Sequence, residues 1–331
     1  MRITRETLLK IARETAEKYS RRNRGLICIY LTGSLLSESP LLGGTTDIDL
    51  VFVHNTEPPF EREVIRLTDE VHLDIAHYSQ SFFYPPRNLR SSPWLGSFLH
   101  ANPMALRDTG HWFEFTQASA GAQFGMAEYV IQRARQPAEA ARQGWFALSS
   151  ADLEGHPAQL HQYLSVLENA ANAVALLSGV PLTERRFLLH YSERAEAAGR
   201  PGLYTGLLDL IQNEDTSREM IEPWLHNWHG DLKIAAMSKD VPQRLSSPRF
   251  AYYERAAAAM LDDHPQAALW LVLRTWTRAV LLSKQVSPGW LEACQQLSLD
   301  ADKLQKRHAA LDAYLDGVEE CLDEWAETYG V

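Results

Sequence analysis

The most constraining feature of this sequence is a pair of aspartates inside an apolar segment typical of a β-strand. Asp47 and Asp49 flank Ile48 in the run Asp47-Ile-Asp-Leu-Val-Phe-Val53. Successive side chains of a strand point to opposite faces, so both carboxylates should lie on one face and Ile48 on the other. Aspartate is depleted in strands, so the pair favours a functional site. The alternative is a strand end that exposes two acids to solvent.

Two further features accompany the pair. An apolar segment runs into the turn Gly33-Ser34, and Asp74 lies in a second strand-like run, Val71–Tyr78. Glycine allows close approach of the backbone to a phosphate, Ser34 adds a hydroxyl, and a helix starting there would point N–H groups at an anion. Taken singly, these are a common turn and a salt-bridge partner. Together with the aspartate pair they predict metal-dependent nucleotidyl transfer, with magnesium held by carboxylate and phosphate oxygens.

This combination resembles the nucleotidyltransferase superfamily (DNA polymerase β-like), whose signature is a Gly-Ser turn, Asp-x-Asp in a strand and a third acid in a later strand. Within it, the sequence is similar to aminoglycoside adenylyltransferases and kanamycin nucleotidyltransferase. The segment Met104–Gln117 resembles their last strand and the following helix start, so the resemblance covers residues 5–120. The sequence departs from the pattern at Ser37-Glu-Ser-Pro40, where many members have a further glycine, and at Thr46, where serine is common.

The resemblance implies a role for each motif residue. Gly33 and Ser34 would hold the β- and γ-phosphates of a nucleoside triphosphate, and Asp47 and Asp49 would bind Mg²⁺. Asp74 would be the third ligand, the general base for the acceptor hydroxyl, or both, although some relatives use an acid of the helical domain as the base. The implied enzyme transfers a nucleoside monophosphate, AMP from ATP as the first expectation, to a hydroxyl of a small acceptor. An aminoglycoside acceptor would make it an antibiotic-resistance enzyme.

The charge is distributed unevenly along the chain of 331 residues, whose net charge is −10. Residues 1–100 contain 12 Lys+Arg and 12 Asp+Glu, so the remainder carries the whole excess. An acidic second part attracts cationic small molecules and repels polyanions, which favours an aminoglycoside-like acceptor over nucleic acid. Solubility alone would also account for this acidity.

The sequence lacks the signs of a membrane or secreted protein. No apolar run approaches the ~20 residues of a membrane span, and the N-terminal residues lack the apolar core of a signal peptide. Cys28, Cys294 and Cys321 have no metal or redox spacing. We therefore expect a cytoplasmic protein without a membrane partner, and the oligomeric state stays open.

The periodicity predicts an α+β protein of two domains. A nucleotidyltransferase domain with a small mixed β-sheet flanked by helices would span residues 1–120, an all-helical bundle that binds the acceptor would span 121–331, and the active site would lie between them. We expect strands near 26–32, 47–54, 71–78 and 103–107, and helices near 4–20 and 60–70. In the second domain we expect helices near 121–135, 138–153, 157–178, 183–197, 203–213, 217–237, 248–284 (broken at His264-Pro265), 288–297 and 301–328.

Other interpretations remain open from the sequence. A regulatory nucleotidyltransferase could AMPylate a protein or RNA partner, as toxin–antitoxin modules do. The spacing Arg185-x4-His190 matches a motif of HEPN-type RNases, but it is short enough to arise by chance. In the helical part, Glu168, Asn169 and Asn172 either line a substrate site or are ordinary helix-surface and capping residues. His72 shares a strand face with Asp74 and is expected to support the metal ligands.

Overall fold

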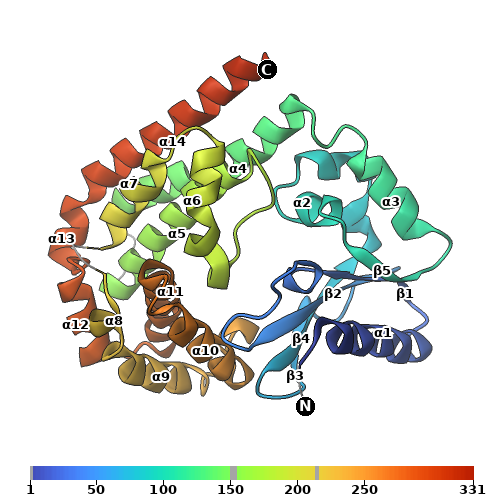
Figure 1. Cartoon of the computed structure of the whole chain (residues 1–331), viewed down its shortest axis with the longest axis horizontal. Helices are drawn as coiled ribbons and strands as arrows, with labels where there is room; N and C mark the ends of the chain where they lie inside the picture. Colours follow the sequence, from blue (N-terminus) through green and yellow to red (C-terminus); the bar gives the residue numbers. More distant parts are fainter. Residues whose placement is uncertain (1–2, 150–154, 213–215) are drawn as a thin grey trace. The chain divides into compact units, whose positions relative to one another are not determined.

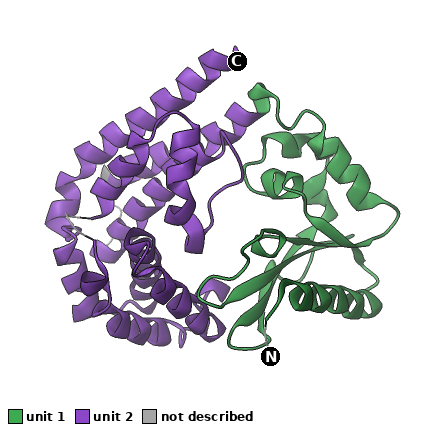
Figure 2. Ribbon diagram, viewed as in Figure 1, with its two compact units in different colours: residues 1–129 green, residues 130–331 purple. Residues whose placement is uncertain are grey.

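The computed structural model of the chain describes residues 3–149, 155–212 and 216–331. The chain divides into two compact units, Met1–Tyr129 and Val130–Val331 (Figure 2). In the described residues the first unit contains a five-stranded mixed sheet and the second is helical, so the predicted α+β class is confirmed. The boundary between the units follows residue 129, whereas the sequence interpretation placed it after residue 120.

The first unit begins with a helix and builds its sheet from five strands (Figure 1). Its strands are β1 (Leu26–Thr32), β2 (Thr46–His54), β3 (Arg62–Arg66), β4 (Val71–Ser79) and β5 (Met104–Asp108). Its α-helices are α1 (Arg5–Arg22), α2 (Leu95–His100) and α3 (Trp112–Gly121), and its 3₁₀ turns are η1 (Ser34–Leu36), η2 (Gln80–Phe83) and η3 (Pro86–Ser91). Thr4 caps α1 by accepting a hydrogen bond from the amide of Thr7, as expected of a helix N-terminus.

The strand order in the sheet is β3-β4-β2-β1-β5. The central pair β2 and β4 is parallel, and the other neighbours are antiparallel. The parallel register places Asp49 opposite Asp74 and Asp47 opposite His72. Residues that are opposite one another in neighbouring strands face the same side of the sheet, so this register brings the acids of both strands to one face.

Each face of the sheet has its own apolar core. Helix α1 covers one face, where Leu8 and Ala12 pack with Ile48 and Leu50 of β2. On the opposite face, Val51 packs in a second core under η2, η3, α2 and α3. The other buried residues of this core include Cys28, Tyr30, Val53, Phe83, Leu89, Leu99 and Phe113. Asp47 and Asp49 precede Val51 on this second face, which is therefore acidic at the start of β2 and apolar towards its end.

The helix that we expected over residues 60–70 is wrong, because this segment forms β3. Strand β3 pairs with β4 in antiparallel register and lies at the edge of the sheet. Val64 and Ile65 are β-branched residues that suit a strand, and Ile65 packs against the core under α1. The hydrophobic periodicity of this short segment does not distinguish a helix from a strand, and pairing with the edge of β4 determines that it forms a strand.

The second unit is built from helices, starting with α4 (Ala127–Ser149), whose first residues belong to the first unit. The others are α5 (His156–Ala175), α6 (Phe187–Ala197), α7 (Gly202–Ile211), α8 (Arg218–Ile221), α9 (Trp224–Ala235), α10 (Phe250–Met260), α11 (Pro265–Ser283), α12 (Pro288–Gln296), α13 (Ala301–Lys306) and α14 (His308–Tyr329), with 3₁₀ turns η4 (Glu184–Arg186), η5 (Gln243–Leu245) and η6 (Ser247–Arg249). Helix α11 is buried over most of its circumference and packs against α5, α6, α9 and α10.

Prolines account for most of the differences from the predicted helices. The expected break before Pro265 is confirmed, and Pro223 divides the helix expected over 217–237 into α8 and α9. By contrast, α4 runs through Pro137 and joins the segments predicted as 121–135 and 138–153, because strong helix formers flank that proline. The helix expected over 301–328 is interrupted at Arg307. The predicted helical residues 150–153 and 213 lie outside the described residues.

Candidate functional site

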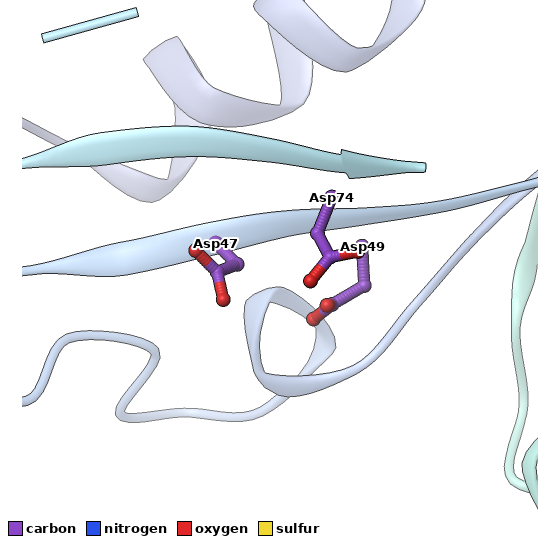
Figure 3. Close-up of side chains that lie close together, drawn as sticks. All are labelled: Asp47, Asp49 and Asp74. Atoms are coloured by element: carbon purple, nitrogen blue, oxygen red, sulfur yellow. The ribbon is translucent and has the colours of Figure 1, made fainter. Parts of the chain in front are cut away.

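Three carboxylates converge on one face of the sheet in the first unit (Figure 3). Asp47 and Asp49 come from β2, and Asp74 comes from the adjacent, parallel β4. One oxygen of each carboxylate lies within 4.8 Å of the corresponding oxygens of the other two. Asp47 and Asp74 are only 5% and 4% exposed, and Asp49 is partly exposed. The strand period and the register therefore gather the three acids that the sequence singled out.

Gly33 directly follows β1 and lies next to the group of acids. It follows Thr32, which is opposite Asp49 in the β1–β2 pair, and it has φ of 80°. A Cβ atom added to Gly33 would lie 2.0 Å from Oδ2 of Asp49, a separation that no side chain can occupy. Glycine is required here for two reasons, the backbone conformation and the close approach of the backbone to the carboxylate.

Ser34 starts the 3₁₀ turn η1, which ends at Leu36. The amide of Leu36 donates to the carbonyl of Gly33 at 3.2 Å, and the amide of Ser37 donates to the carbonyl of Ser34 at 2.9 Å. The helix that starts at Ser34 is thus a single 3₁₀ turn, too short for a substantial helix dipole. The hydroxyl of Thr46 donates to the carbonyl of Pro40 at 3.1 Å and ties the following loop to the start of β2.

His72 lies beside the acids, as its strand face predicts. Its Nδ1 atom is 3.8 Å from Oδ1 of Asp47, and the side chain is fully buried. A separation of 3.8 Å is longer than a hydrogen bond, so this distance places the imidazole beside the carboxylate of Asp47 without fixing its orientation. The sequence prediction of a supporting position for His72 is therefore compatible with its placement next to Asp47.

Arg62 is a neighbour of the acids that the sequence interpretation missed. Its Nε donates to Oδ1 of Asp74 at 2.6 Å, and its side chain is 42% exposed whereas that of Asp74 is 3% exposed. In the β3–β4 register Arg62 is opposite Ala76 and Val64 is opposite Asp74, which puts Arg62 on the acid face. The sequence interpretation missed Arg62 because it predicted a helix over residues 60–70, and such a helix does not place Arg62 next to Asp74.

The group of acids suits a hard metal cation. All three side chains offer carboxylate oxygens, the donors that Mg²⁺ and Ca²⁺ prefer. Carboxylates this close together repel one another unless positive charge is near them. The donor set and the spacing of the oxygens, with the backbone of Gly33 at contact distance, show a cluster that could hold a metal ion.

The acids and amides considered in the helical unit have structural partners. The carboxylate of Glu168 accepts hydrogen bonds from Arg274 at 2.6 and 3.0 Å. The amide of Asn172 donates to the carbonyl of Glu168 at 2.9 Å, and its oxygen accepts from the backbone N–H of Leu182 at 2.7 Å. Glu168 and Asn172 therefore stabilise the bundle through interior contacts, which differs from the helix-surface or capping role considered as the alternative.

Arg185 and His190 show no shared catalytic contact among the described interactions. The guanidinium of Arg185 stacks 3.4 Å from the ring centroid of Tyr252 and donates to its carbonyl oxygen at 3.3 Å. His190 lies 3.8 Å from a carboxylate oxygen of Glu193 one turn further along α6. Arg185 lies in the turn η4 and His190 lies in α6, and each has its own contacts.

Comparison with known proteins adds no family assignment. No protein family model matches the sequence, and a search of curated proteins finds no significant match. Within the described part of the chain, no helix combines the length and the apolar character that crossing a membrane requires.

Proposed function

We propose that this protein is a magnesium-dependent nucleotidyltransferase. The observation that carries the proposal is the convergence of Asp47, Asp49 and Asp74 next to the backbone of Gly33. An anion-binding turn beside three hard oxygen ligands is the arrangement that a metal-bound triphosphate needs. The motif resemblance and the fold class point in the same direction.

The proposed nucleotide site assigns the triphosphate to the turn after β1. Gly33 has no side chain between its backbone and the acids, and Ser34 offers a hydroxyl beside it. Gly33 and Ser34 would hold the phosphates, and Asp47 and Asp49 would hold the cation. When bound, Mg²⁺ stabilises the charge on the phosphate oxygens as a Lewis acid.

The proposed reaction is an in-line displacement at the α-phosphorus of ATP. The oxygen of an acceptor hydroxyl forms a bond to the α-phosphorus, and the bond from that phosphorus to the bridging oxygen of pyrophosphate breaks. Asp74 accepts the hydroxyl proton, and pyrophosphate leaves. A positioned carboxylate can accept this proton as the new bond forms.

Asp74 is a better candidate for the base than Glu168 and Glu184 of the helical unit. Glu168 accepts two hydrogen bonds from Arg274, and Glu184 accepts hydrogen bonds from Arg278 and from the hydroxyl of Tyr253. Burial alone would raise the pKa of Glu184, but Arg278 and further arginines hold that pKa below its usual range. Both carboxylates are engaged in ion pairs inside the helical unit, whereas Asp74 lies in the acid cluster beside Gly33.

A small cationic acceptor of the aminoglycoside type fits the charge of the chain. The net charge of −10 is carried entirely by the residues after residue 100. Negative potential concentrates cationic ligands and disfavours polyanions such as nucleic acids. We therefore propose ATP as the nucleotide and the hydroxyl of a polyamine-like small molecule as the acceptor.

The test is a magnesium-dependent assay of pyrophosphate release with each of the four NTPs against a panel of aminoglycosides. Asp49→Asn removes one ligand charge with almost no change of shape. Asp69→Asn is the matched control, because Asp69 is an exposed acid that pairs with Arg66 in the turn before β4. We expect release that depends on ATP and on one drug, is retained in Asp69→Asn and is lost in Asp49→Asn.

Two other results would contradict parts of the proposal. Full turnover in Asp49→Asn would remove the carboxylates from the mechanism. If ATP binds but no drug supports turnover, the aminoglycoside acceptor is wrong, and AMPylation of a protein or RNA becomes the reaction to assay.

A further inference from the structure

Arg62 brings a positive charge to the acid cluster at hydrogen-bond distance. Strand β3, at the edge of the sheet, carries it, and its Nε donates to Oδ1 of Asp74 at 2.6 Å. The pairing of β3 with β4 fixes the position of Arg62. Arg62 is in register with Ala76, and the carbonyl of the preceding residue, Glu61, accepts a hydrogen bond from the amide of His77 at 2.8 Å. The contact is thus built into the strand pairing.

Arg62 and a metal ion would use the same carboxylate. Asp74 is one of the three acids whose oxygens lie within 4.8 Å of one another, and it is almost fully buried. A cation bound by these acids would lie within a few ångströms of the guanidinium. At that separation the positive charge of Arg62 opposes the binding of a divalent cation until the side chain moves away.

The exposure of Arg62 allows the contact to be given up. Its side chain is 42% exposed, so the guanidinium can move into solvent without burying a charge. Because Arg62 is the partly exposed partner, the ion pair can be exchanged for a metal–carboxylate contact while the buried Asp74 stays in place. The ion pair between Arg62 and Asp74 therefore has the properties of a contact that a divalent cation can displace.

We infer that Arg62 is a positioning residue that holds Asp74 while the metal site is empty and competes with divalent cations for this carboxylate. The inference rests on the metal site of the proposed function. It implies that free Mg²⁺ binds weakly, and that the site is loaded efficiently only when the cation arrives with a triphosphate whose own negative charge offsets that of Arg62.

The experiment measures Mn²⁺ binding to the full chain without nucleotide, by the loss of the free-ion signal in electron paramagnetic resonance. We expect Arg62→Ala to bind Mn²⁺ on the order of tenfold more tightly than the wild type, because a unit charge about 5 Å from a divalent cation has an effect of this size even at the dielectric constant of water. Arg62→Lys retains the charge and should bind Mn²⁺ within about twofold of the wild type.

Two further variants separate charge, hydrogen bonding and general surface effects. Arg62→Gln keeps a donor for Oδ1 of Asp74 but loses the charge, and it should bind Mn²⁺ as tightly as Arg62→Ala. Arg66→Ala is the matched control, since Arg66 lies on the same face of β3 but pairs with Asp69 outside the cluster. It should leave Mn²⁺ binding unchanged.

Thermal unfolding supplies a second readout that does not depend on activity. A ligand that binds only the folded state raises the melting temperature in proportion to the logarithm of its concentration over its dissociation constant. Mg²⁺ should therefore raise the melting temperature of Arg62→Ala and Arg62→Gln more than that of the wild type or of Arg66→Ala.

The outcomes distinguish failure of this inference from failure of the metal site. Equal or weaker Mn²⁺ binding in both Arg62→Ala and Arg62→Gln, with binding still lost in Asp49→Asn, overturns the competing role of Arg62 alone. Mn²⁺ binding that Asp49→Asn leaves unchanged overturns the metal site and the inference together.

Discussion

The protein contains two groups of buried or partly buried acids that are arranged in opposite ways. In the first unit, Asp47, Asp49 and Asp74 lie directly beside one another. In the helical unit, Glu168 is held by Arg274, and Glu184 by Arg278. The first arrangement places three like charges together with one partly exposed guanidinium, that of Arg62, at Asp74, whereas the second gives each acid its own guanidinium.

The difference separates acids that stabilise the fold from acids that are available for a ligand. An arginine between two carboxylates compensates their burial and fixes the helices that carry them. Neighbouring carboxylates repel, so their proximity is unfavourable for the fold and is retained where a bound cation gives it a function. Replacing a carboxylate by its amide should therefore have opposite consequences in the two groups.

The largest effect is expected from Asp47→Asn on activity. The change removes one charge from the acid group at almost constant volume, and turnover should fall at least about a thousandfold, as for loss of a group that stabilises the charge of the transition state. The melting temperature in the absence of metal should stay the same or rise, because repulsion from Asp49 and Asp74 is relieved. A clear loss of stability in this variant would break the comparison.

The same exchange in the helical unit should instead destabilise the fold. Glu168→Gln leaves the buried guanidinium of Arg274 without its carboxylate, and we expect a loss of about 3 kcal/mol in the free energy of unfolding. Asp323→Asn is the control, since Asp323 forms an exposed pair with Arg135 and should change stability by less than about 0.5 kcal/mol. Denaturant titrations of the three proteins would compare these values, and equal stability of Glu168→Gln and the wild type would refute the structural role.

The sequence predicted the acid group better than its surroundings. The alternation in β2 and β4 determines which side chains share a face, so the meeting of Asp47, Asp49 and Asp74 could be predicted from three short motifs. Arg62 could not, because β3 forms only where the edge of β4 offers hydrogen bonds, and its own five residues do not select a strand. The roles of the three acids in catalysis remain predictions.

Substitution of Gly33 tests how closely the backbone approaches the acids. Gly33→Ala places a methyl group 2.0 Å from an oxygen of Asp49 and also strains a backbone with φ of 80°, so we expect a loss of about 2–3 kcal/mol in stability together with loss of activity. Gly110→Ala is the matched control, because Gly110 has φ of 64° but no atom within 4 Å of the added carbon. It should lose only about 1 kcal/mol and retain activity. Equal losses in both variants would show that the contact with Asp49 is unimportant.

Buried histidines extend the comparison of the two units to their dependence on pH. On the face of the sheet under α1, Nε2 of His54 lies 2.9 Å from Nδ1 of His77, and burial lowers the pKa of both imidazoles. In the helical unit, burial, and then the charge of Arg274, lowers the pKa of His161 to about 4. All three histidines are therefore neutral in the folded protein at neutral pH.

The smallest effect near neutral pH should come from these histidines. Their folded pKa values lie below the unfolded value of about 6.5, so the unfolded chain binds protons first as the pH falls. The stability that they contribute is complete above about pH 6.5 and decreases below it, by at most about 1.4 kcal/mol per pH unit for each histidine. For His161 the decrease continues to about pH 4. Denaturant titrations at several pH values between 7.5 and 5 would give the free energy of unfolding as a function of pH. This free energy should fall less steeply with decreasing pH in His161→Gln than in the exposed control His111→Gln. An equal dependence on pH in both variants would show that protonation of His161 does not contribute.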